Sequence, residues 1–268
     1  MTAAGGPTGF ETIVDRPDYY IEFLDARTSI DDENYIKQLI VKLLEPSDGL
    51  SVLDVGTGTG ADASQIAALV APHGKVVGVD QSPKMIEEAR RRVAGGGLPV
   101  EFVEGDALAL DFADGTFDRA RTERLLIHVA DPVAAIREMV RVTRPGGIVV
   151  ASDIDGGTMF LNSSNKDLAT KLALGLTDGL ANGWVGRRLQ RYFIEAGLED
   201  VRCATTIVQN SVAFMRMVAA GRLQLMVDTG QATAEDVTTF WDELDEGERA
   251  GWLCSGVVCF TVVGRKRS

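Results

Sequence analysis

The chain has 268 residues, of which 45% are hydrophobic and 25% charged, as is typical of a globular α/β domain with a sizeable core. Twenty-seven basic and 39 acidic residues give a net charge of −12, which disfavours nucleic acid as a partner because its phosphates would be repelled. The three cysteines are odd in number and lack metal-ligand spacing, which predicts buried thiols and a cytoplasmic location. No apolar run could span a bilayer, and the N-terminus has no secretory-signal pattern.

In chain order, residues 1–48 predict a helical lid, whose helix is closed by Pro46. Strands and short helices then alternate from residue 50. The strands are predicted at 50–55, 75–80, 100–106, 117–122 and 147–155, and the helices between them at 61–71, 82–94 and 131–143. Such alternation is typical of a parallel sheet with helices on both faces.

The second half of the chain follows another pattern. Helices are predicted over 164–182 and 183–198, a strand over 200–208, a long helical stretch from Ser211 to about Arg249, and a last strand over 255–266. An insertion of this length between two strands predicts a helical cap, mainly 211–250, over the C-terminal edge of the sheet. Residues 1–268 therefore form one domain, with a cofactor-binding core at 49–153 and the remaining strands and cap at 154–268.

The stretch "VLDVGTGTGAD" from Val52 to Asp62 is the strongest local motif. A strand, then glycines, then a helix place bare amides at a helix N-terminus, where a polar or anionic cofactor binds. Gly56, Gly58 and Ala61 also satisfy the G-x-G-x-x-A fingerprint. Asp80 stands where that fingerprint needs an acid, so the motif alone leaves a nicotinamide cofactor open.

Three acids end three successive predicted strands, namely Asp54, Asp80 and Asp106. Ligands of such sheets bind outside the carboxyl ends of the strands. An acidic cleft at this edge favours a ligand that carries a sulfonium and an ammonium group over one that carries a pyrophosphate. The chain also lacks the Tyr-x-x-x-Lys pair of a short-chain reductase, which disfavours a nicotinamide oxidoreductase.

Four stretches carry a family resemblance: "VLDVGTGTG", "VVGVDQSPKMIEEAR", "VEFVEGDALALDFADGTFD" and "VRVTRPGGIVVASD". In order and spacing, over about residues 50–153, they resemble the successive motifs of the class I S-adenosylmethionine-dependent methyltransferases. The nearest branch is that of ubiquinone/menaquinone and natural-product enzymes. The resemblance implies a Rossmann-like, seven-stranded, mostly parallel sheet with helices on both faces, an antiparallel last strand and a helical cap. It also implies S-adenosylmethionine as cofactor, S-adenosylhomocysteine as product, and no metal.

The resemblance assigns cofactor contacts to the glycine loop and the ends of the strands. Asp80 would bind the ribose diol, Asp106 with its neighbours the adenine edge, and the glycine loop with Asp54 the methionine end. An alternative for Asp80 and Asp106 is capping of the turns that follow their strands. The implied contacts are Asp54, Gly56, Thr57, Gly58, Gly60, Asp80, Gln81, Met85, Gly105, Asp106, Ala107 and Thr122.

The candidate catalytic residues are His128, in "RTERLLIHVADP", and Asp153. In related natural-product enzymes a histidine and an acid at these places are viewed as an acid/base pair. Ile127 stands where those enzymes have a first histidine, so the alternative for His128 is packing. The alternative for Asp153 is a strand-end turn. Glu123 and Arg124 are expected to form a local ion pair rather than to reach the cofactor.

Substrate contacts are predicted at Tyr19, Tyr20, Trp184 and Met215, with core packing as the alternative for each. The predicted reaction is in-line methyl transfer to an O, N or C atom of a small, fairly apolar metabolite or natural product. One alternative is a cyclase or isomerase that does not methylate on this scaffold. Another is a partner subunit that holds the cofactor without catalysis. Neither nucleic acid nor membrane insertion is expected, and the sequence leaves a homodimer open.

Overall fold

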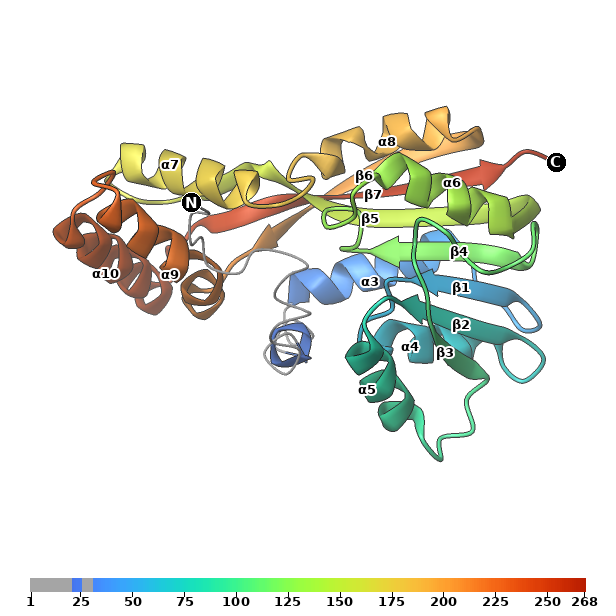
Figure 1. Cartoon of the computed structure of the whole chain (residues 1–268). Helices are drawn as coiled ribbons and strands as arrows, with labels where there is room; N and C mark the ends of the chain where they lie inside the picture. Colours follow the sequence, from blue (N-terminus) through green and yellow to red (C-terminus); the bar gives the residue numbers. More distant parts are fainter. Residues whose placement is uncertain (1–20, 26–30) are drawn as a thin grey trace.

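The computed structural model describes residues 21–25 and 31–268. Its centre is one seven-stranded sheet with the strand order β3-β2-β1-β4-β5-β7-β6 (Figure 1). Neighbouring strands from β3 to β5 are parallel, whereas β7 is antiparallel to β5 and to β6. This confirms the predicted sheet and its antiparallel last strand. The strands are β1 Ser51–Val55, β2 Lys75–Asp80, β3 Val100–Glu104, β4 Phe117–Glu123, β5 Thr143–Leu161, β6 Leu198–Gln209 and β7 Ser255–Lys266.

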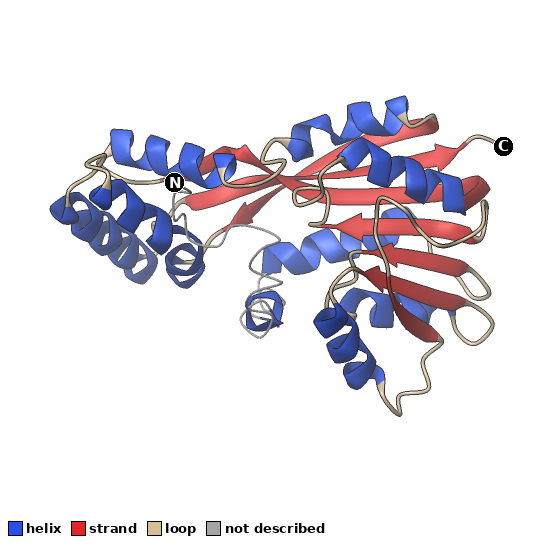
Figure 2. Cartoon of the chain, viewed as in Figure 1, coloured by secondary structure: helices blue, strands red, loops and turns tan. Residues whose placement is uncertain are grey.

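Helices cover both faces of the sheet (Figure 2). One apolar cluster joins α6 and α8 to one face, and a second joins α3, α4 and α5 to the other. The central strand β1 supplies residues to both clusters because its side chains alternate between the two faces. The helices are α3 Asp31–Leu44, α4 Ala61–Val70, α5 Pro83–Val93, α6 Pro132–Val142, α7 Lys166–Asp178, α8 Val185–Glu195, α9 Val212–Asp228 and α10 Ala234–Ala250.

Local signals set where the core helices begin. The Ser82 hydroxyl accepts a hydrogen bond from the Met85 amide at the start of α5, and Pro83 occupies its first turn. The Asp131 carboxylate accepts from two amides at the start of α6. Both helices therefore begin directly after the loops that border the carboxyl ends of the strands.

A cap is formed by α7, α9 and α10 at the far end of the long strands β5, β6 and β7 (Figure 1). These helices share their own apolar cluster, which includes Leu172, Met215 and Phe240. The long helical stretch predicted from Ser211 to about Arg249 consists of two helices, because the chain breaks after α9. Thr233 caps α10 there, since its hydroxyl accepts from the Asp236 amide at 3.1 Å and its amide donates to the Asp236 carboxylate at 2.8 Å.

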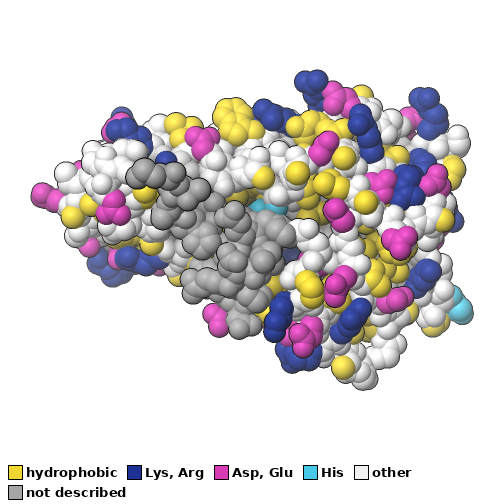
Figure 3. Space-filling model, viewed as in Figure 1, with side chains coloured by type: hydrophobic (Ala, Val, Ile, Leu, Met, Phe, Trp, Pro, Cys, Tyr) yellow, Lys and Arg dark blue, Asp and Glu magenta, His cyan; other side chains and the backbone are white. Residues whose placement is uncertain are grey.

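The strand predicted over 147–155 is longer in the structure, because β5 runs to Leu161. Among the described residues, no helix is long and apolar enough to cross a membrane. Acidic and basic side chains alternate over the face shown in Figure 3, so the net charge does not gather in one patch of that face.

Candidate active site

The carboxyl ends of β1, β2, β3 and β4 border a cleft that opens to solvent. Small ligands and cofactors typically bind in concave sites at this edge of an α/β sheet. The cleft is lined by Leu24, Val55, Gly56, Gly58, Val79, Asp80, Gln81, Met85, Gly105, Asp106, Ala107, Glu123, Arg124, Leu125, His128 and Val129. The structure thus brings together nine of the residues assigned from the sequence, from three strand ends and the loop after β4.

The loop after β1 presents bare backbone to this cleft. Gly56 and Gly58 have positive φ angles of 74° and 53°, which favour glycine. A Cβ on Gly56 would lie 3.1 Å from the side chain of Leu125, and one on Gly58 would lie 3.3 Å from Leu24. The amide of Gly56 donates to the Val79 carbonyl at 2.8 Å, which fixes the loop beside β2. Side chains in this loop would therefore narrow the cleft.

The third glycine of the motif has another role. Gly60 does not line the cleft but caps α4 with a φ of 76°. A Cβ there would lie 2.5 Å from the ring of Phe102 and 2.9 Å from Ala89, which are on β3 and α5. Gly60 therefore lets α4 approach its neighbours, and the position argues against the predicted cofactor contact.

Asp80 connects the glycine loop to the start of α5. One carboxylate oxygen accepts from the Gly58 amide at 2.9 Å, and the other accepts from the Ser82 amide at 2.9 Å. Burial raises the pKa of Asp80, and these two hydrogen bonds act against that effect. Gln81 and Met85 lie beside it in the cleft wall. Asp80 thus caps a turn and also lines the cleft.

Asp106, which follows β3, likewise caps a turn and lines the cleft. Its carboxylate accepts from the Leu108 amide at 2.8 Å, and Asp106 lines the cleft together with Gly105 and Ala107. A Cβ on Gly105 would lie 2.9 Å from Val79, so this segment packs closely against β2. The two acids stand on neighbouring strand ends, since β2 pairs with β3.

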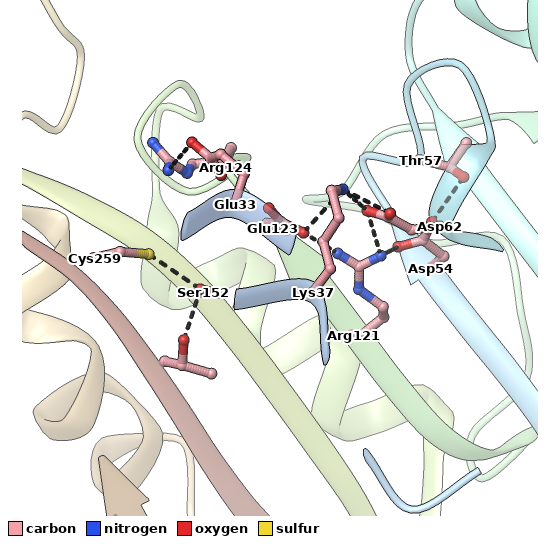
Figure 4. A network of polar contacts seen from close by, with 11 residues as sticks. Glu33, Lys37, Asp54, Thr57, Asp62, Arg121, Glu123, Arg124, Ser152 and Cys259 are labelled. Atoms are coloured by element: carbon pink, nitrogen blue, oxygen red, sulfur yellow. Dashed lines mark hydrogen bonds and ion pairs between the residues drawn. The ribbon is translucent and has the colours of Figure 1, made fainter. Parts of the chain in front are cut away.

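A second hollow adjoins the cleft at the glycine loop and contains a buried ion-pair network centred on Arg121 (Figure 4). The Arg121 guanidinium lies 3.4 Å from Asp54, 3.1 Å from Asp62 and 2.9 Å from Glu123. Although burial opposes its charge, these acids raise the pKa of Arg121. The hydroxyl of Thr57 also donates to Asp54 at 2.8 Å. The expected acidic cleft therefore does not extend to Asp54, which lies beside the Arg121 guanidinium.

Helix α3 adds charged side chains to this hollow. The Lys37 ammonium lies 2.6 Å from Asp62 and 3.7 Å from Glu123, and Arg124 forms an ion pair with Glu33 at 2.8 Å. Burial alone would raise the pKa of Asp62, but the nearby charges of Arg121 and Lys37 hold this pKa at about 2. Glu123 and Arg124 therefore do form ion pairs, but with separate partners. The hollow carries both signs of charge and suits a zwitterionic group.

The loop after β4 closes the other side of the cleft with Leu125 and His128. Its backbone is held by buried polar groups. The Asp153 carboxylate accepts from the Ile127 amide at 3.0 Å, and the Asn182 side-chain amide donates to the Val129 carbonyl at 2.5 Å. Burial raises the pKa of Asp153 to about 7, against the influence of nearby Arg124. The structure thus places Asp153 as a support of the His128 loop.

The structure places three other predicted site residues away from the cleft and does not describe two more. Thr122 is buried within β4, and Met215 is buried in the apolar cluster of the cap. Trp184 is 41% exposed and lies under the Arg187 guanidinium, 4.1 Å from the ring centroid. These positions favour packing over ligand contact. Tyr19 and Tyr20 lie outside the described residues.

Leu24 and Asn182 are among the contributors to the site that sequence reasoning missed. Leu24 borders both the cleft and the adjoining hollow, yet nothing in its local pattern singles it out. Asn182 anchors the His128 loop from 53 residues further along the chain than Val129. The sequence "NGWVGRRL" begins at Asn182 and could have drawn attention to this residue. The prediction selected Trp184 from the same stretch instead.

Comparisons with known proteins agree with this geometry. A family model described as "Methyltransferase domain" matches residues 46–197. The demethylmenaquinone methyltransferase of Desulfitobacterium hafniense is 34% identical over 44% of this chain and 48% of its own. Methyltransferase GfsG of Streptomyces halstedii is 40% identical over 53% and 49%. The YcgJ protein of Bacillus subtilis shares the fold with a TM-score of 0.62 and 20% identity, over 88% of this chain and 99% of its own. The chain spans about half the length of these curated relatives.

Proposed function

Because the chain belongs to the methyltransferase domain family, we propose that it transfers a methyl group from S-adenosylmethionine to a small, fairly apolar molecule at an O, N or C atom. The observation that carries this proposal is the cleft between the glycine loop and the His128 loop. Support for a small-molecule acceptor comes from a relative that is named for methylation of demethylmenaquinone.

The residues present fit the two ends of S-adenosylmethionine. Asp80 and Asp106 present carboxylates at neighbouring strand ends, where they would bind the ribose hydroxyls and the adenine amine. The hollow beside Lys37, Arg124 and Glu123 offers both charges, as the zwitterionic methionine end requires. The bare backbone at Gly58 leaves space between these two regions.

When bound, S-adenosylmethionine would supply a sulfonium methyl group, to which an acceptor would bond in line as the carbon–sulfur bond breaks and S-adenosylhomocysteine leaves. The chain itself would orient the acceptor and exclude water from this place, and positioning alone contributes much to such a reaction. Leu125 and His128 line the same cleft as Asp80 and Asp106, and His128 would take a proton from an acceptor that carries one. Asp153 would act through the backbone of this loop as a positioning residue.

The decisive experiment combines binding with product mass. Calorimetry should show binding of S-adenosylhomocysteine and none of NAD. The purified protein is then incubated with methyl-deuterated S-adenosylmethionine and a small-molecule extract of the source cells, with the Asp80→Ala variant as control. A metabolite that gains the labelled methyl group with the natural chain, and does not gain it with the Asp80→Ala variant, supports the proposal. A metabolite that is isomerised without gaining label would instead establish a cyclase or isomerase.

A further inference from the structure

Among the residues that the structure describes, strand β6 is the outermost strand of the sheet and pairs on one side only, with β7. In an antiparallel pair, alternate residues direct both backbone polar groups toward the partner strand. The Asn210 amide donates to the Ser255 carbonyl beside β7, whereas the Gln209 amide donates away from β7, to Asp32. The register is continuous from Arg202 to Gln209. The amides of Cys203, Thr205 and Ile207 therefore point outward from the sheet.

This free edge has a defined length. At one end, the Asp32 carboxylate accepts from the Gln209 amide at 2.9 Å and occupies the edge. At the other end, the register shifts between Glu199 and Arg202, and Asp200 has a φ of 52°. No described residue donates to or accepts from the outward backbone groups of 203, 205 and 207. The unpaired ladder is centred on Thr205.

The edge also lacks the usual protection against pairing. Exposed edge strands normally carry charged residues or proline, but residues 203–209, "CATTIVQ", contain neither. Four of these seven residues are β-branched, and Ile207 is 55% exposed. In a chain with a net charge of −12, this acid-free stretch is a place where two copies can meet without repulsion.

We propose that β6 pairs with β6 of a second copy of this chain, antiparallel about a two-fold axis at Thr205. Such an interface is isologous, so each copy offers the same surface to the other. Thr205 then faces Thr205, and Cys203 of one copy faces Ile207 of the other. All three positions have outward backbone groups, so every facing pair is of the hydrogen-bonded kind. The two sheets join into one continuous sheet.

Charge complementarity supports this register. Arg202 is exposed and forms no ion pair with any described residue. It lies on the same side of β6 as Val208, and Val208 packs in the apolar cluster that includes α3. Asp32, at the start of α3, marks the opposite end of the free ladder on that same face. The antiparallel arrangement brings Arg202 of each copy beside Asp32 of the other.

Sedimentation velocity over rising protein concentration tests the proposal. The expected result is an increase in mass to twice the 28.7 kDa of one chain, at concentrations up to about 1 mM. Thr205→Pro removes an outward amide and leaves the β6–β7 ladder intact, so this variant should stay monomeric. Thr205→Val should dimerise like the natural chain. A natural chain that is monomeric throughout, or a Thr205→Pro variant that dimerises, would overturn the proposal.

Disulfide trapping checks the register without proline. In a Cys203→Ser background, Thr205→Cys places two thiols on the axis, where facing Cα atoms about 5.5 Å apart permit a disulfide. Cys203→Ser alone is the control, because the exposed Cys254 remains in it. In the natural chain the Cα atoms of the two Cys203 residues would be about 14 Å apart and should not link. A link through Cys203, or none through position 205, would contradict the two-fold axis at Thr205.

Discussion

Gly60→Ala should destabilise the protein by more than its backbone conformation alone explains. With a φ of 76°, an alanine there costs about 1–2 kcal/mol for the left-handed conformation. The added methyl group would lie 2.5 Å from the Phe102 ring and 2.9 Å from Ala89, and overpacking of this kind costs about 1–3 kcal/mol more. We therefore expect a total loss of about 2–5 kcal/mol in the free energy of unfolding.

Gly97→Ala is the matched control, because Gly97 also has a positive φ, of 65°, but a Cβ there would meet nothing within 4 Å. Urea unfolding followed by circular dichroism measures both variants, and their difference isolates the packing cost. Equal stabilities of the two variants would refute the packing role of Gly60. So would a Gly60→Ala protein of normal stability that fails to bind S-adenosylhomocysteine, since Gly60 does not line the cleft.

Four further changes follow from the site. Asp80→Ala should weaken S-adenosylhomocysteine binding by about tenfold or more, and an unchanged affinity in calorimetry would remove Asp80 from the cofactor site. His128→Ala should lower kcat with little change in that affinity, whereas full turnover would leave His128 a packing role. Arg187→Ala leaves the fully buried Asp155 without its guanidinium partner and should cost about 2–4 kcal/mol, less than for a fully buried pair because Arg187 is 37% exposed. Because burial raises the pKa of Asp153 from 3.8 to about 7, the stability that its neutral form contributes is complete below pH 3.8 and is lost as the pH rises through 7. The difference in unfolding free energy between the natural chain and Asp153→Asn should therefore change over this range, and a pH-independent difference would contradict the assignment.

The parts of the fold that local sequence signals determine were predictable. Apolar runs bounded by glycines and caps located the core strands, and Ser82 marked the start of α5 correctly. The break before α10 was missed, although Thr233 and Asp236 form a readable capping box. The network around Arg121 could not be predicted, because Lys37 reaches it from another helix and ion pairs between distant segments leave no periodic pattern.

The two buried acids of β5 hold two neighbouring segments in place beside the cleft. Asp153 and Asp155 are two residues apart and therefore point to the same side of the strand. Asp153 holds the backbone of the His128 loop, and Asp155 binds the amide and the guanidinium of Arg187 at the start of α8. Asn182 then joins the two held segments directly, through its hydrogen bond to Val129. Since each buried acid is costly without its partners, the His128 loop and the start of α8 keep one relative position. Buried hydrogen bonds therefore tie this cleft wall to strand β5, and such positioning of groups is what an in-line reaction depends on.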